Sequence, residues 1–332
     1  MLTSPATSSA DRPAVPDATV TATSRLARDV VRDRLFRGTT KVSGALVFGM
    51  VLAILVTLAL GASLALRKFG FGFLTSTAWN PVTEEFGAAA PIYGTLITSV
   101  IAMLIGVPLS FGVALFITEV APVWLKRPIG TAVELLAAIP SIIYGMWGLF
   151  IFAPWFADHL QPWIQEHIGS LPLVGALVQG PPMGIGMFTA GLILAIMVIP
   201  FITAVMRDVF TQVPTELRES AYGLGATTWE VVRHVILPYT KVGVIGGIML
   251  GLGRALGETM AVTFVIGNAQ RINASLFMPG NTISSALANE FTEAVGDTYT
   301  ASLLALGLIL FLITFIVLAF ARLLLGRIGG RI

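Results

Sequence analysis

The chain has 332 residues, of which 55% are hydrophobic and only 11% are charged, and its formal net charge is +2. A soluble domain carries about a quarter charged residues, so we expect most of this chain to lie in a membrane. The absence of cysteine excludes a disulfide framework, thiol redox chemistry and thiolate metal sites. The three histidines do not share one helix face at metal-ligand spacing, and we predict no metal and no cofactor.

The N-terminal 41 residues differ in composition from the rest of the chain. Residues 1–24 are rich in Ser, Thr, Ala and Pro, which predicts a disordered cytoplasmic segment. In residues 25–41, apolar side chains recur on one helix face and arginines on the other, as in helices that lie on the inner membrane surface. A plain basic segment that only sets the orientation of the chain explains these residues equally well.

Six apolar segments are long enough to cross a membrane, which takes about 20 residues. They are residues 42–66, 92–118, 131–155, 183–206, 242–267 and 301–321. They predict an all-α integral membrane domain over residues 42–325, followed by a short tail at 326–332. Pro108, Pro140 and Pro200 interrupt the second, third and fourth segments, and such breaks indicate a bundle whose neighbouring helices satisfy the freed backbone groups. The glycines of the fifth segment suit close helix approach.

The distribution of Lys and Arg predicts the orientation of these spans. With the N-terminus in the cytoplasm, sixteen of these residues lie inside, three lie outside, and Arg254 lies within the fifth span. The two termini and the loop 207–241 are therefore expected in the cytoplasm. The long loops 67–91, 156–182 and 268–300 are expected outside.

The loop 207–241 carries helix signals that an ordinary connection between spans lacks. Pro214 suits a first helical position, and Glu216 and Glu219 lie early, where the helix dipole favours acidic residues. Gly223 and Gly225 are typical of a helix end. These residues predict one short helix on the cytoplasmic side.

A second short helix is predicted directly after the first. Thr227 with Glu230 three residues on has the spacing of a capping box, and Pro238 is expected to end the helix. Two short helices displayed outside the membrane suggest a surface made to fit another protein.

The sequence lacks the motifs of nucleotide binding and of hydrolytic catalysis. There is no Gly-Lys dipeptide, so no phosphate-binding Walker loop exists, and any nucleotide that drives transport must bind another chain. No Gly-x-Ser-x-Gly elbow and no paired intramembrane carboxylates occur. We predict that the chain is not an enzyme.

Arg254 and Glu258 are charged residues inside the fifth span. Their i,i+4 spacing predicts that both lie on one helix face. An arginine at mid-membrane costs about 2.5–3.5 kcal/mol on insertion scales, so Arg254 is expected to face the bundle interior or an aqueous path. Its planar guanidinium suits an oxyanion, and Glu258 is expected to hold it in place. The alternative is a structural ion pair that fixes helix packing.

The stretch Glu219-Ser-Ala-Tyr-Gly-Leu-Gly225, followed after nine residues by Val235-Ile-Leu-Pro238, resembles the EAA loop of bacterial ABC-importer permeases. Ser220 and Val235 are small departures from that pattern, Glu-Ala-Ala-x3-Gly-x9-Ile-x-Leu-Pro. In that family the loop forms a coupling helix that enters a groove on the ATPase. The resemblance assigns the docking role to Glu219, Ala221, Gly225, Leu237 and Pro238.

Further stretches are similar to the permeases of phosphate importers in particular. They are Ala78-Trp-Asn-Pro81, Pro91-Ile-Tyr-Gly-Thr-Leu96, Leu136-Ala-Ala-Ile-Pro-Ser-Ile142, Gly145-Met-Trp-Gly148, Ala195-Ile-Met-Val-Ile-Pro200 and Gly253-Arg-Ala-Leu-Gly-Glu-Thr-Met-Ala-Val262. The resemblance covers about residues 44–325 and implies a type I ABC importer permease fold in the bacterial inner membrane. It assigns the substrate path to Arg254, Glu258 and Thr259.

The same resemblance implies the partners. They are a second permease (PstA-like), two ATPase subunits (PstB-like), a periplasmic phosphate-binding protein (PstS-like), the lipid bilayer and inorganic phosphate, with no nucleic acid. Three alternatives stay open. The first is another oxyanion such as sulfate or molybdate. The second is a stand-alone channel or secondary transporter, in which internal repeats with paired broken helices are expected. The third is a membrane scaffold, which leaves Arg254 unexplained.

Overall fold

The computed structural model describes residues 18–172 and 174–329 of the chain. It divides into two compact units, residues 1–56 and 57–332, and the boundary falls inside the first helix. The α-helices are α1 (Ala18–Phe69), α2 (Gly72–Thr75), α3 (Ala89–Leu115), α4 (Val123–Ala138), α5 (Ser141–Trp147), α6 (Ala153–Trp155), α7 (Gln161–Ile168), α8 (Met187–Thr211), α9 (Thr215–Gly223), α10 (Thr228–Val231), α11 (Leu237–Leu256), α12 (Met260–Ile266), α13 (Ile283–Glu290) and α14 (Asp297–Gly329).

Short irregular helices and one hairpin complete the secondary structure of the described residues. The π-helical turns are η1 (Phe116–Val120), η2 (Gly148–Phe152), η3 (Phe156–Leu160) and η5 (Val232–Ile236), and η4 (Gly175–Leu177) is a 3₁₀ turn. The strands β1 (Trp79–Asn80) and β2 (Glu85–Phe86) pair antiparallel, with Trp79 opposite Phe86. Because η1, η2, η3 and η5 each continue an α-helix, several spans are longer than their α-helical parts.

The first unit consists of the N-terminal part of α1. The segment 25–41 and the first predicted span belong to this one helix, without a break between them. Of the segment predicted to be disordered, residues 1–17 lie outside the described residues, and residues 18–24 form the first turns of α1. An ion pair one turn apart, between Arg37 Nε and Asp33 Oδ2 at 2.8 Å, lies on its exposed surface.

Five helices in the described residues are long and apolar enough to cross a membrane, and a bent pair makes a sixth if it counts as one span. Each of the six predicted segments overlaps one of these spans, but the third is not a straight helix and the fifth ends at Leu256, before its predicted bound. Its two parts, Val123–Ala138 and Ser141–Ile168, meet at 89°. Ile139 is extended, with ψ 128°, as the residue before a proline prefers. The third span is therefore broken at Pro140.

The other two prolines of the predicted spans do not break their helices. Pro108 lies inside α3 and Pro200 inside α8, and both helices continue past them. At this level the hydroxyl of Ser110 donates a hydrogen bond to the carbonyl oxygen of Ile199, at 3.1 Å. This bond links α3 to α8 beside the two prolines, but its acceptor is not a carbonyl that either proline leaves without its N–H donor.

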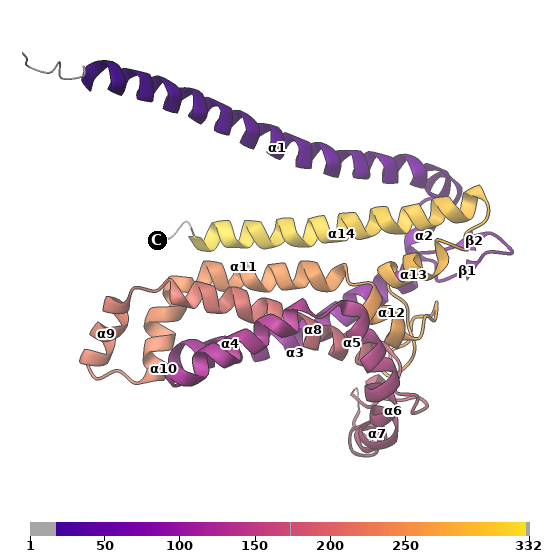
Figure 1. The fold of residues 1–332 in the computed structure, drawn as a ribbon. Helices are drawn as coiled ribbons and strands as arrows, with labels where there is room; N and C mark the ends of the chain where they lie inside the picture. The colour runs from indigo at the N-terminus through magenta and orange to yellow at the C-terminus, as the bar shows by residue number, and fades with distance from the viewer. Residues whose placement is uncertain (1–17, 173, 330–332) are drawn as a thin grey trace, which may run out of the picture. The chain divides into compact units, whose positions relative to one another are not determined.

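Helices α3, α8 and α11 form the core of the second unit (Figure 1). Gly243, Gly247 and Gly251 lie four residues apart on the face of α11 that contacts α8. A Cβ added to Gly243 would lie 2.6 Å from Val209, and one added to Gly251 would lie 2.5 Å from Ile202. The expected close helix approach in the fifth span is confirmed, since in lipid such contact replaces the hydrophobic effect as the source of helix association.

Two groups of short helices lie at opposite ends of this bundle. Figure 1 shows α9 and α10 at one end, and α6, α7 and α13 at the other. At the second end the carboxylate of Glu290 accepts hydrogen bonds from the Trp79 indole, from the Tyr299 hydroxyl at 2.9 Å and from the Gln270 amide at 3.2 Å. Glu290 therefore joins β1 to the loop after α12 and to the start of α14.

Candidate functional site

The loop between α8 and α11 contains the two predicted short helices. Helix α9 follows Pro214 and ends at Gly223, and Gly225 has φ +87°, a conformation that favours glycine. Before α10 the backbone N–H of Thr227 donates to the Glu230 carboxylate at 2.8 Å. The N–H of Glu230 donates in return to the Thr227 hydroxyl at 3.4 Å. The predicted capping box is therefore confirmed.

The predicted helix end at Pro238 is wrong. Helix α10 continues through the π-helical turn Val232–Ile236 directly into α11, and Pro238 lies in the first turn of α11. A proline in an uninterrupted α-helix lacks an N–H donor and its ring collides with the carbonyl four residues earlier. The π-helical turn just before Pro238 changes the hydrogen-bond register there, so the helix passes through.

The five residues assigned to docking do not share one environment. Glu219, Gly225 and Pro238 are exposed, whereas Ala221 and Leu237 are half-buried and pack against the bundle core. The most exposed apolar side chains of the loop are Leu224 and Trp229, which are 91% and 62% exposed. No residue of α9 is buried. The outward surface of the loop therefore also includes two apolar residues outside the predicted set.

One buried charge pair attaches α9 to the bundle. Arg218 Nη1 lies 3.3 Å from Glu119 Oε1, and Arg218 Nη2 lies close to the carbonyl oxygen of Phe210 and donates to it. The Glu119 side chain is only 5% exposed and that of Arg218 19%. This contact is not predictable from the sequence, because the partners are 99 positions apart and no local pattern connects them.

The fifth predicted span is interrupted between α11 and α12. Helix α11 ends at Leu256 and α12 begins at Met260, so Arg254 and Glu258 do not lie on one continuous helix face. No ion pair joins them within the described part of the chain. Glu258 Oε1 instead accepts a hydrogen bond from the N–H of Ala261, at 3.2 Å, at the start of α12. The predicted i,i+4 pair is therefore wrong.

Helix α11 ends before the predicted span does. Gly257 follows it directly, with φ −96° and ψ 1°, and the chain leaves the helix there. Arg254 remains in the last turn of α11 with an exposed side chain, and Glu258 and Thr259 are half-buried in the break. The three residues are close in sequence but belong to different local structures.

The two broken spans meet in the bundle. Helix α12, after the break in the fifth span, packs on α5, after the break in the third. Gly145 of α5 permits this, since a Cβ there would lie 2.9 Å from the Phe264 ring and 3.1 Å from the backbone of Ala261. Internal repeats with paired broken helices were the feature expected of a self-sufficient transporter. Because two broken spans occur here, broken helices alone do not distinguish a permease subunit from a stand-alone transporter.

Comparison with known proteins identifies the family. A sequence model described as "Binding-protein-dependent transport system inner membrane component" matches residues 106–330. The chain is 59% identical over 304 residues to "Phosphate transport system permease protein PstC" of Mesorhizobium japonicum, covering 92% of this chain and 93% of that one. It is 61% identical over 306 residues to the protein of the same name from Pasteurella multocida, covering 92% and 95%.

Solved structures agree with the fold. The chain aligns at 19% identity and TM-score 0.57 with a bacterial ABC transporter involved in the import of the acidic polysaccharide alginate, covering 91% of this chain and 99% of that one. Identity this low supports the fold alone. The family model and the sequence matches show that this chain belongs to the binding-protein-dependent transport system inner membrane components, the permease subunits of ABC importers.

Proposed function

We propose that this chain is the permease subunit of an ATP-driven importer of inorganic phosphate in the bacterial inner membrane. The observation that carries the proposal is the identity of 59–61% to phosphate transport permeases over 92% of the chain. The chain itself is not the ATPase; hydrolysis takes place on a partner. The termini and the α9–α10 loop lie in the cytoplasm, as the distribution of Lys and Arg predicts.

Arg254 indicates that the chain forms only half of the transport path. Its side chain is exposed on a helix that is apolar and long enough to span the membrane. An arginine facing lipid there is costly, so another chain or a water-filled path must cover it. A second permease (PstA-like) packed against α11 meets this need. Arg254, Glu258 and Thr259 then line the path, and the Arg254 guanidinium provides the positive charge that attracts the transported phosphate.

The α9–α10 loop is the proposed contact with the ATPases (PstB-like). Its exposed residues Glu219, Leu224 and Trp229 combine a charge with two apolar side chains. Ala221 and Leu237 pack inward and support the loop instead of touching the partner. A periplasmic phosphate-binding protein (PstS-like) delivers the anion at the opposite end of the bundle.

The substrate is tested by uptake of labelled phosphate in a strain that lacks this chain. We expect loss of uptake, restoration by the chain, and no competition from sulfate. Restored sulfate or molybdate uptake, with phosphate uptake unaffected, would replace phosphate with another oxyanion. Uptake by the purified chain without an ATPase would indicate a stand-alone transporter instead.

The path and the docking loop are tested separately. Arg254→Ala should abolish uptake while the complex still assembles, and normal uptake in that variant would remove Arg254 from the path. Gly225→Glu should leave the spans folded but uncouple ATP hydrolysis from uptake. Exposed Gly223 is the matched control position for a new glutamate, because it lies outside the proposed docking set.

A further inference from the structure

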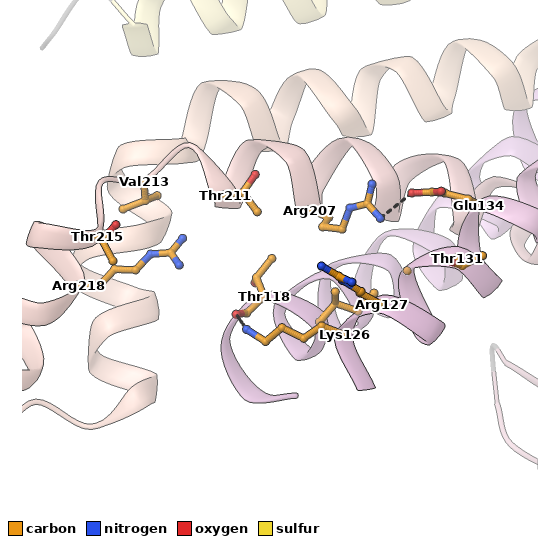
Figure 2. Close-up of a pocket in the computed structure, with 12 residues that line it drawn as sticks. Thr118, Lys126, Arg127, Thr131, Glu134, Arg207, Thr211, Val213, Thr215 and Arg218 are labelled. Carbon is orange, nitrogen blue, oxygen red and sulfur yellow. Dashed lines mark hydrogen bonds and ion pairs between the residues drawn. The ribbon is translucent and has the colours of Figure 1, made fainter. Parts of the chain in front are cut away.

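A cavity of about 570 Å³ lies beside α9, at the end of the bundle that carries the α9–α10 loop. Its walls come from η1, α4, the end of α8 and the start of α9, together with residues of the loop between α8 and α9. Figure 2 shows Arg218 on one side of it, Lys126 and Arg127 on another, and Arg207 with Glu134 on a third. Four cations and one carboxylate therefore line this basic pocket.

Two of the cations are already compensated. Arg207 contacts Glu134 at 2.9 Å and Asp208 at 3.2 Å, and Arg218 contacts the buried Glu119 at 3.3 Å. These contacts hold both guanidinium groups at the wall of the pocket. The Nε of Arg218 is buried and donates no hydrogen bond within the described residues.

The remaining two cations have no carboxylate partner in the part of the chain that the structure describes. Lys126 Nζ donates to the carbonyl oxygen of Thr118 at 2.6 Å, which directs the ammonium to the pocket without neutralising it. Arg127 is exposed and makes no ion pair there. Even when Asp208 and Glu119 are counted with Glu134, four cations face three carboxylates, so the cluster keeps an excess positive charge.

The surface beside this pocket has the composition of a membrane boundary. Val123 and Trp124, three and two residues before Lys126, are largely exposed apolar side chains, and tryptophan is enriched at membrane–water interfaces. The hydroxyls of Thr131 and Thr215 line the pocket and make no hydrogen bonds among the described residues. A tetrahedral oxyanion could accept hydrogen bonds from both the cations and these hydroxyls.

We propose that this pocket, lined by Lys126, Arg127, Arg207 and Arg218, binds a phosphate group. Two sources supply that chemistry at a membrane surface: free inorganic phosphate and the headgroup of an anionic lipid. Basic pockets between spans at the cytoplasmic surface are suited to lipid headgroups. The site is separate from Arg254, so a bound group here is not the anion in the proposed path. It contacts α9 through Arg218, and binding would therefore stabilise the position of the α9–α10 loop.

The test measures the reactivity of Lys126 in the full chain with its co-purified subunits. The complex is placed in nanodiscs of neutral lipid, and lysines are modified with an amine-directed acylating reagent in buffer without phosphate. Site-resolved mass spectrometry then compares Lys126 with Lys241, which lies outside the pocket. One arm adds inorganic phosphate, and the other replaces part of the neutral lipid with phosphatidylglycerol.

At about ten times its Kd, a bound phosphate group should slow modification of Lys126 about tenfold and leave Lys241 unchanged. Protection in the first arm identifies free phosphate, and protection only in the second identifies the lipid headgroup. Equal Lys126 reactivity in both arms and in the untreated sample would overturn the proposal. The readout is independent of uptake, so it can fail while the transport function holds.

Two variants make the test specific. Arg127→Gln removes an unpaired cation without breaking a native contact, and it should raise the phosphate or lipid concentration needed for protection by about tenfold. Arg233→Gln removes an exposed arginine at the same end of the bundle that does not line the pocket, and it should change nothing. An equal shift in both variants would show a diffuse charge effect and contradict a built site.

Discussion

The helical core and the α9–α10 loop are stabilised in different ways. In the core, α11 lies against α8 along three glycines spaced four residues apart, and side chains such as Leu194, Ile202 and Met206 are fully buried. In the loop, α9 has no buried residue and depends on Arg218, a glycine turn and a capping box. Packing spreads the stability of the core over many contacts, whereas the loop depends on a few polar ones.

This difference indicates how each region responds to substitution. A close-packed core is destabilised both by added and by removed volume, but each substitution removes only a part of its many contacts. Helix α9, which has no buried residue and one charge pair to the bundle, can be released by a single substitution. The exposed Leu224 and Trp229 of the loop gain burial only when a partner covers them. The following changes test that contrast, from the largest expected effect to the smallest.

Removing the charge pair should have the largest effect. Arg218→Met leaves Glu119 buried without a counter-charge, which costs about 3 kcal/mol for a buried pair that loses one partner. We expect amide hydrogen exchange across α9 to accelerate by about a hundredfold, measured by mass spectrometry on the complex in nanodiscs.

A control variant and a compensating second substitution show whether the lost charge pair causes that acceleration. Exposed Arg233, which has no ion pair among the described residues, is the matched control, and Arg233→Met should leave exchange in α9 unchanged. Adding Glu119→Gln to Arg218→Met should recover part of the loss, because no buried charge is then left alone. If α9 exchanges at the original rate in Arg218→Met, the pair does not attach the loop.

Adding one methyl group to the core should have the next largest effect. In Gly251→Ala the new Cβ would lie 2.5 Å from Ile202, and such overpacking costs about 1–3 kcal/mol. Gly246→Ala is the control on the same helix, because nothing lies within 4 Å of its Cβ position. Thermal unfolding should show a lower Tm for the first variant only, and equal Tm values would mean that α11 and α8 do not approach this closely.

The turn between α9 and α10 should be sensitive to backbone conformation alone. Gly225 has φ +87° with open space around it, so Gly225→Ala brings strain of about 1–2 kcal/mol and no collision. Gly223 also has open space but an ordinary helical backbone, and Gly223→Ala should not destabilise the loop. Hydrogen exchange in α9 and α10 distinguishes the two, and the same result for both would exclude a strained turn.

The capping box should contribute the smallest effect. Thr227→Ala removes the hydroxyl that accepts the N–H of Glu230 and should destabilise the start of α10 by about 1 kcal/mol. Thr228→Ala, one residue on and outside the box, is the control and should be nearly neutral. Faster exchange in the first variant, confined to the first turn of α10, is the expected result, and a change that reaches α14 would contradict a local role.

The sequence was most informative where the relevant interactions are short in range. Runs of apolar residues identified the six spans, and Thr227 with Glu230 identified the start of α10, because a span and a cap depend only on residues within a few positions of each other. The spacing from Glu219 to Pro238 pointed to the family in the same way. None of these features depends on contacts between residues that are far apart in the sequence.

The effects of the prolines, and the end of α11, could not be predicted from the local sequence. Pro140 breaks its span, whereas Pro108 and Pro200 lie within continuous helices and Pro238 follows a π-helical turn. Each of these prolines lacks the backbone N–H donor, yet only one of them breaks its helix. Whether a helix continues past a proline therefore depends on the surrounding structure and not on the proline alone. The break after Leu256, which separates Arg254 from Glu258, likewise replaced a helix that the sequence pattern favours.

By itself, then, the sequence determined the number of spans, the two loop helices and the family resemblance. Only the tertiary structure decided the contact between Arg218 and Glu119, the meeting of the two broken spans, and the basic pocket beside α9. The physical reason is distance along the chain. Hydrogen-bonded turns and caps form between near neighbours, whereas ion pairs and close helix contacts join residues that are brought together only when the bundle packs.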